Sequence, residues 1–186
     1  MALKSTIFKA QLALADIDHG YYADHSFTIA RHPSETDERM MIRLAALAIN
    51  AHKLQTVCNG NGTLGFGGGL STPDEADVVL RDYTSRPRVW IEVGQPEDKP
   101  IAKACGLADE VIVYPFSSSA DIWWRSIEGK LVRLSNLSVW RIDAQASQAL
   151  AQLAQRTMQL QATVHEGVLC VVDGSHSVDI EPVRLK

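Results

Sequence analysis

The stretch Gly69–Gln95, GLSTPDEADVVLRDYTSRPRVWIEVGQ, decides the fold. It contains two apolar, β-branched runs, Val78–Leu80 and Val89–Val93, separated by a turn rich in arginine and proline, and this pattern predicts a β-hairpin. Asp77 begins the first run and Glu92 lies near the end of the second. Two carboxylates on neighbouring strands can converge on one hard cation such as Mg²⁺ or Mn²⁺. The hairpin therefore predicts a metal site, although acidic residues at strand ends are often simply exposed to solvent.

Length and composition indicate one globular domain over residues 1–186. Apolar residues make up 46% of the chain and charged residues 22%, which are ordinary values for a packed protein. The formal net charge of −4 counts against a general nucleic-acid-binding surface. Nucleic acid would have to bind to a local basic face.

The three cysteines, Cys58, Cys105 and Cys170, lie far apart and form no CxxC pair. This spacing predicts reduced thiols in a cytoplasmic protein rather than a zinc site. The N-terminal residues contain no uninterrupted apolar segment of the kind found in signal peptides. The most apolar helix, Met40–Ala51, is interrupted by Arg43 and is too short to span a bilayer. We therefore expect a soluble cytoplasmic protein with no membrane partner.

The first half of the chain predicts a hairpin and then a long helix. Two extended segments, Ser5–Leu14 and Tyr21–Ile29, flank a turn and predict an antiparallel pair. Ser34 is the expected N-cap of the helix, whose apolar stripe runs over residues 40–54. Glu38 lies in the first turn at the edge of the buried face, where it either serves a site or stabilises the helix dipole.

Residues 59–69, NGNGTLGFGGG, hold half of the glycines in the chain and predict a loop. The loop is not a P-loop, because no Gly-Lys-Ser/Thr follows it and no helix begins on it. It is either a lid beside Asp77 or a connector, and glycine-rich loops are mostly connectors.

Helices and strands alternate through the second half of the chain. The expected elements are a helix from Pro96 to near Gly106, a buried strand over 110–116, a helix over 117–134, a strand over 137–142, a helix over 144–157 capped by Asp143, and an antiparallel meander over 163–164, 168–172 and 178–182. This order predicts an α/β (α+β) fold with a mixed central sheet, flanking helices and antiparallel hairpins at both termini.

The order of helix, strand with Asp77, strand with Glu92, helix and strand resembles the core of the PD-(D/E)XK nuclease-like fold. Over nearly its whole length the chain is similar to the YaeQ family, a variant of that restriction-endonuclease-like fold. The resemblance is carried by ALKSTIFKA at 2–10, YYADHSFTIARHPSETDERMMIRL at 21–44, STPDEADVVLRDY at 71–83 and WIEVGQP at 90–96. Some members of that family are linked to transcription of a virulence gene.

The resemblance implies roles for the two hairpin acids. Asp77 matches the metal-binding Asp of the nuclease motif, with Ala76 in place of the usual proline. A literal Pro73–Asp74 lies just upstream and is the second choice. Glu92 matches the second acidic ligand, and the backbone carbonyl of Val93 is the next one implied.

The remaining motif positions match less well. The helix carboxylate implied by the fold is Glu38, or alternatively Glu35. The lysine expected two residues after Glu92 is replaced by Gly94, and a bulge there would bring Gln95 into its place. Glutamine can orient a water molecule but carries no charge. Lys103, on the following helix, is a candidate for supplying that charge from another backbone position.

The resemblance therefore implies metal-dependent phosphodiester hydrolysis, with Asp77, Glu92 and Glu38 around Mg²⁺ or Mn²⁺, Gln95 placing the water and Lys103 offsetting developing charge. Candidate phosphate contacts are Arg31, Arg39, Arg43, Arg81, Arg86 and Arg88. Ion pairing with neighbouring carboxylates is an equal alternative for Arg39 and Arg43.

Two other functions stay open. The first is a catalytically inactive nuclease-fold module that acts through a protein partner in transcription, which the missing lysine and the negative charge favour. The second is hydrolysis of a small phosphorylated metabolite, which needs no broad basic surface.

Overall fold

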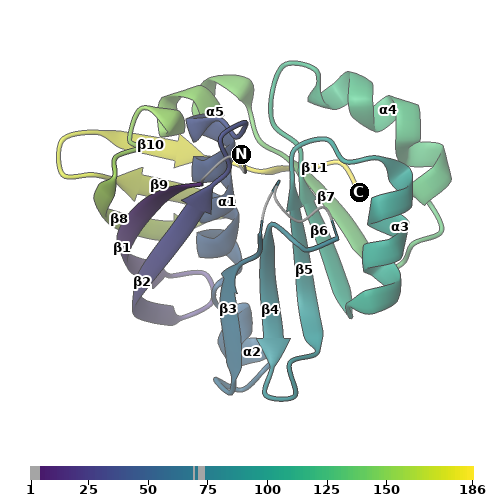
Figure 1. Cartoon of the computed structure of the whole chain (residues 1–186), viewed down its shortest axis with the longest axis horizontal. Coiled ribbons are helices and arrows are strands. Elements are labelled where there is room, and N and C mark those ends of the chain that lie inside the picture. Colours follow the sequence, from purple (N-terminus) through teal and green to yellow (C-terminus); the bar gives the residue numbers. More distant parts are fainter. Residues whose placement is uncertain (1–4, 69, 71–73) are drawn as a thin grey trace.

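Figure 1 shows a computed structural model of the chain, which describes residues 5–68, 70 and 74–186. These residues form two β-sheets, each with parallel and antiparallel pairs, and five helices. The predicted mixed α+β class is therefore confirmed. The sequence predicted that the hairpins at the two termini would be added to one central sheet. They build a second sheet of their own instead.

The first sheet joins the two ends of the chain in the order β10-β9-β8-β1-β2. Its strands are β1 (Thr6–Asp16), β2 (Tyr21–Arg31), β8 (Thr157–His165), β9 (Val168–Val172) and β10 (Ser177–Ile180). The predicted β1–β2 hairpin and the closing antiparallel meander are both present. The prediction of a helix through Thr157 was wrong, because burial alternates along β8, which pairs in parallel with β1.

The second sheet has the order β11-β7-β6-β5-β4-β3. Its strands are β3 (Gly62–Phe66), β4 (Val78–Asp82), β5 (Pro87–Val93), β6 (Glu110–Tyr114), β7 (Leu137–Arg141) and β11 (Val183–Arg184). The predicted hairpin of β4 and β5 is confirmed. The glycine-rich segment is not only a loop, since β3 lies within it and pairs with β4 at the edge of the sheet. Gly69 and Pro73, which the sequence analysis singled out, lie outside the described residues.

The helices are α1 (Asp37–Asn50), α2 (Lys53–Thr56), α3 (Asp98–Leu107), α4 (Ala120–Leu131) and α5 (Ala144–Ala151). Asp143 caps α5 as predicted, accepting from the backbone of Gln145. Ser34 was the wrong cap for α1, because the Thr36 hydroxyl accepts the hydrogen bond from the Arg39 backbone N–H at 3.1 Å. The helix therefore begins two residues later than Ser34 implied, with Asp37 and Glu38 in its first turn.

Helix α1 lies between the two sheets, and α3 and α4 cover the outer face of the six-stranded sheet (Figure 1). Because α1 packs on both sides, Met40, Met41 and Ile42 are all fully buried although they point in successive directions around the helix. Each such side chain contributes about 1.5–3 kcal/mol of transfer free energy. The same helix also carries Arg43, with no exposed surface, into the space between the sheets.

The cysteines and the helices bear on two further predictions, free thiols and the absence of a membrane-spanning helix. Cys58, Cys105 and Cys170 are free thiols, as predicted. Among the helices that the structure describes, none has the length and apolar character needed to cross a membrane.

Candidate functional site

Asp77 lies directly before β4, where it is 2% exposed and is held by Arg39 from α1. The Nη2 atom of Arg39 donates to both carboxylate oxygens of Asp77, at 2.8 Å each, and to the carbonyl oxygen of Val93 at 3.3 Å. The backbone N–H of Val93 donates in turn to Asp77 at 2.8 Å. One guanidinium nitrogen therefore lies among the oxygens that the nuclease resemblance assigned to a metal ion.

The second acid of this cluster is Glu35, the alternative from the sequence analysis, which lies just before the Thr36 cap of α1. Its carboxylate accepts from Arg39 Nη1 at 2.9 Å and from Arg43 Nη1 at 3.0 and 3.1 Å. Glu35 and Arg43 are both buried, and the Nε atom of Arg43 is 4.0 Å from Asp77. We call Glu35, Arg39, Arg43, Asp77 and Glu92 the arginine cluster.

Glu92 completes the cluster from β5. Its burial, and next the nearby Asp77 carboxylate, raise the pKa of Glu92 from 4.5 to about 7. A hydrogen bond from Trp90 Nε1 to Glu92, at 2.6 Å, opposes this rise only in part. The two hairpin acids therefore do converge in space, and Glu92 retains its proton at pH values where an exposed glutamate has lost it.

The cluster balances its charge without any added ion. Two arginines face Glu35 and Asp77, so the group is neutral when Glu92 carries its proton. A divalent ion at Asp77 would have to displace Arg39, whose guanidinium would lose both of its hydrogen bonds to Asp77. Such a loss is costly in a buried site. The residues around Asp77 in this structure therefore do not fit a bound Mg²⁺ or Mn²⁺ ion.

Glu38 and Gln95 make contacts outside the arginine cluster. The Glu38 carboxylate accepts a hydrogen bond from the Ser147 hydroxyl of α5 at 2.5 Å. Gln95 donates through Nε2 to the hydroxyls of Ser117 and Ser119, at 3.0 Å each. Gly94, between Gln95 and the hairpin strand, has φ +97°, a left-handed conformation that turns the chain away after β5.

Lys103 from α3 lies on the solvent side of the same region. Its ammonium group pairs with Asp74 at 2.6 Å, and this contact lowers the pKa of Asp74. Lys103, Asp74 and Lys99 share a cavity of about 310 Å³ with Trp90 and Glu92. The structure therefore brings Lys103 and Glu92 to one cavity, while Asp77 stays buried behind Arg39.

The profile of the YaeQ protein family matches residues 1–182 of the chain. The chain belongs to the YaeQ family. It is 41% identical over 182 residues to the uncharacterized protein YaeQ of Escherichia coli (strain K12), an alignment covering 97% of this chain and 95% of that one. The protein of the same name in Salmonella typhi is 40% identical, over 97% and 96% of the two chains.

Two crystal structures of YaeQ proteins have nearly the same fold. The YaeQ protein from Xanthomonas axonopodis pv. citri superposes with a TM-score of 0.88 at 39% identity, over 98% of both chains. The YaeQ protein from Pseudomonas syringae also gives a TM-score of 0.88, at 30% identity, over 98% of this chain and 96% of that one. The two-sheet architecture is thus shared within the YaeQ family, and the names of these relatives state no activity.

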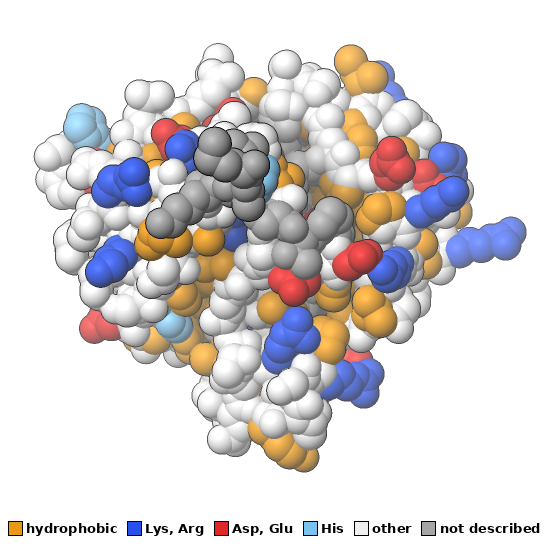
Figure 2. All heavy atoms as spheres, viewed as in Figure 1, with side chains coloured by type: hydrophobic (Ala, Val, Ile, Leu, Met, Phe, Trp, Pro, Cys, Tyr) orange, Lys and Arg blue, Asp and Glu red, His pale blue; other side chains and the backbone are white. Residues whose placement is uncertain are grey.

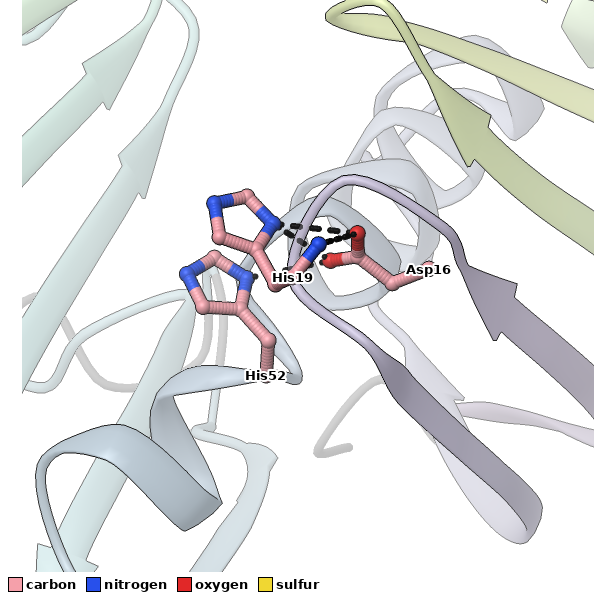
Figure 3. Close-up of side chains that lie close together, drawn as sticks. All are labelled: Asp16, His19 and His52. Atoms are coloured by element: carbon pink, nitrogen blue, oxygen red, sulfur yellow. Dashed lines mark hydrogen bonds and ion pairs between the residues drawn. The ribbon is translucent and has the colours of Figure 1, made fainter.

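A second polar cluster in this YaeQ-family chain was missed in the sequence. Asp16 ends β1, His19 lies in the turn before β2, and His52 follows α1 (Figure 3). The Nδ1 atom of His19 is 2.9 Å from Asp16, and that of His52 is 3.2 Å away. We call these three residues the histidine cluster, a candidate metal-binding group.

The histidine cluster borders a cavity of about 480 Å³ between the two sheets. His19 and His52 line it, together with residues of β6 and β7. Burial, and next the neighbouring His19 ring, lower the pKa of His52, which favours its neutral form. The one local signal in the sequence was the Asp-x-x-His spacing in a turn, because His52 comes from a distant segment.

Proposed function

We propose that this protein is a nuclease-fold-derived binding module in which Arg39 replaces the catalytic metal ion, and that it acts through a protein partner rather than by hydrolysis. The PD-(D/E)XK relationship is part of this proposal. It is supported by the helix, two strands, helix and strand order around Asp77 and Glu92. A cytoplasmic, transcription-linked role belongs to the same proposal.

The observation that carries the proposal is the position of the Arg39 guanidinium. Its Nη2 atom contacts both oxygens of Asp77 and the carbonyl oxygen of Val93. These are the oxygens that a hard cation requires. A fixed cationic side chain neutralises them but has no exchangeable water to activate, so the cluster retains the fold of a metal site without its chemistry.

The surface also favours a protein partner over nucleic acid. Five of the six arginines considered as phosphate contacts are paired with carboxylates: Arg31–Asp37, Arg39–Asp77, Arg43–Glu35, Arg86–Asp109 and Arg88–Asp109. On the face shown in Figure 2, basic side chains are scattered among acidic ones and form no single patch. Phosphate binding depends on a concentration of unpaired positive charge.

One observation favours the rival function, phosphodiester hydrolysis. Glu92, with its pKa raised to about 7, shares a cavity with Lys103. A perturbed carboxyl group beside a lysine in a cavity is typical of acid–base sites. A substrate of that size, about 310 Å³, would be a small phosphorylated molecule rather than a duplex.

The decisive experiment compares the effect of Mg²⁺ on wild type and Arg39→Met. Mg²⁺ is used because imidazole is a poor ligand for it, so the histidine cluster does not contribute. We expect no rise in the melting temperature of the wild type in millimolar Mg²⁺. We expect a clear rise in Arg39→Met, where the oxygens of Asp77 and Val93 become free to bind the ion.

Cleavage assays on DNA, RNA and small phosphate esters complete the test, with Asp77→Asn as the control. Mg²⁺ stabilisation of the wild type, together with cleavage that Asp77→Asn abolishes, would overturn the binding-module proposal in favour of hydrolysis. Cleavage that persists in Asp77→Asn would come from a contaminant or from another site.

A further inference from the structure

The histidine cluster combines two segments that are distant in the chain. Asp16 ends β1 and His19 lies three residues later in the following turn, whereas His52 lies just beyond α1 and is brought to them by the fold. Figure 3 shows both imidazole rings directing their Nδ1 atoms at the Asp16 carboxylate. The rings lie parallel, with centroids 3.6 Å apart and an angle of 2° between their planes.

Asp16 is a buried carboxylate that lacks a strong cationic partner. It has no exposed surface, and among the described residues its ion-pair contacts are with the two imidazoles only. The other side-chain contact is the backbone N–H of His19, at 3.0 Å. A buried carboxylate is expensive unless a cation compensates it. The site therefore has an uncompensated negative charge and two nitrogen ligands beside it.

The distances also suit one metal ion. An ion about 2.0–2.2 Å from each N and O ligand holds neighbouring ligand atoms about 2.8–3.6 Å apart. The observed separations from Asp16 are 2.9 Å to His19 Nδ1 and 3.2 Å to His52 Nδ1. The same distances suit hydrogen bonds, so a proton and a metal ion compete for one place.

We propose that Asp16, His19 and His52 bind a divalent transition-metal ion of the Zn²⁺ class. Two imidazoles and one carboxylate favour such an ion over Mg²⁺ or Ca²⁺, which prefer sites made of oxygen. His19 has 45% of its side chain exposed and lies on a turn, so its ring can pivot out of the stack to aim its lone pair at the ion. His52 and Asp16 are held in place by burial.

Three protein ligands leave at least one position of the ion for another ligand. His19 and His52 line the 480 Å³ cavity between the sheets, which also contains Lys53 and Arg184. Because Asp18 and Glu110 also line this cavity and Glu110 is paired with Lys53 at 2.8 Å, a water molecule is the ligand that such surroundings favour. The site is thus separate from the arginine cluster, and its test does not depend on the proposed function.

The test is a calorimetric and thermal titration of the chelator-treated full-length protein with Zn²⁺, and with Mg²⁺ as a comparison. We expect one equivalent of Zn²⁺ to bind. We also expect the melting temperature to rise by about 5–10 °C at a free concentration 100 times Kd. Mg²⁺ should give no such rise.

Two variants locate the site, and one controls for surface histidines. His52→Gln should weaken Zn²⁺ binding at least tenfold, and His19→Gln, at an exposed position, provides the same test without disturbing the core. His176→Gln is the matched control, since His176 also lies beside an aspartate, Asp173 at 3.4 Å, but is 73% exposed. It should bind Zn²⁺ like the wild type.

Co²⁺ provides a spectroscopic readout that separates histidine ligands from cysteine ligands. We expect visible d–d bands without thiolate charge-transfer bands, lost in His19→Gln. Absence of binding to the wild type, undiminished binding in both variants, or thiolate bands from Cys58, Cys105 or Cys170 would overturn the proposal.

Discussion

The arginine cluster and the histidine cluster are both buried groups around an aspartate, and they differ in what lies at the centre. Asp77 receives two hydrogen bonds from the fixed cation of Arg39. Asp16 accepts hydrogen bonds from the ring and the backbone of His19, and the His52 ring lies 3.2 Å away, so its side-chain partners are imidazoles, which can exchange a proton for a metal ion. The first cluster has its positive charge built into the chain, whereas the second needs it from solution.

Carboxylates in the right places do not by themselves make a metal site. Asp77 and Glu92 converge as the hairpin predicted, yet a guanidinium already satisfies the oxygens nearest to Asp77. Asp16 was not singled out in the sequence, and its side-chain partners are imidazoles, which are themselves metal ligands. The two clusters differ in whether the group that contacts the aspartate can be displaced by a metal ion.

The largest effect is expected at Arg39. Arg39→Met leaves Glu35 with one cationic partner fewer and removes the main partner of Asp77, so unfolding free energy should fall by about 3–5 kcal/mol. Urea unfolding monitored by circular dichroism measures this loss. Arg86→Met, at an arginine that is 62% exposed and paired with Asp109, is the control and should cost at most about 1 kcal/mol. Equal losses in the two variants would show that the cluster is not a built-in ion pair.

The next effect concerns the proton on Glu92. Its pKa is raised from 4.5 to about 7 in the folded state, so the folded protein binds more protons than the unfolded chain between these values. The resulting stabilisation is fully present below pH 4.5 and disappears as pH rises through 7, a change on the order of 3 kcal/mol.

Glu92→Gln removes this pH dependence, because glutamine stays neutral throughout. Urea unfolding at several pH values between 5 and 8 should show wild type losing stability relative to the variant. Glu181→Gln, at an exposed glutamate, should follow the wild-type profile. Parallel profiles for wild type and Glu92→Gln would contradict the charge balance assigned to the arginine cluster.

A smaller effect is expected at Asp16. Asp16→Asn keeps the shape of the side chain but loses one acceptor oxygen for His19 and the negative charge that faces His52, so about 1–2 kcal/mol should be lost in metal-free protein. Thermal unfolding in chelator measures it. A loss as large as that of Arg39→Met would mean that the two clusters do not differ in their dependence on a fixed cation.

The smallest effect is expected at Ser147. Ser147→Ala removes the hydroxyl that donates to Glu38, at a cost of about 1 kcal/mol. Because Glu38 contacts α5 and not Asp77 in this structure, the Mg²⁺ response of the Ser147→Ala, Arg39→Met double variant should equal that of Arg39→Met. A changed response would connect Glu38 to the arginine cluster.

Local signals in the sequence were sufficient to predict much of the fold. The β4–β5 hairpin and the Asp143 cap of α5 depend on neighbouring residues, and both are present. The strand β3 was missed because glycine has low strand propensity, and its pairing with β4 compensates for that. The start of β8 was missed because its partner β1 lies at the other end of the chain.

The candidate site was predictable only in part for a similar reason. The approach of Asp77 and Glu92 follows from the register of adjacent strands. The choice between Glu35 and Glu38 does not, because Glu35 lies before the helix and its position depends on contacts with Arg39 and Arg43 that no local pattern specifies. The histidine cluster combines a turn and a helix end, and their proximity depends on the packing of the whole molecule.

The parallel pairing of β1 with β8 has a consequence for folding in the cell. Strand β1 lies in the interior of its sheet, and its parallel neighbour β8 is completed only at His165. Until then one edge of β1 has no partner, and such open edges invite association with other chains. This sheet can therefore assemble only after β8 has been made, and contacts of such large sequence separation are of the kind that form slowly.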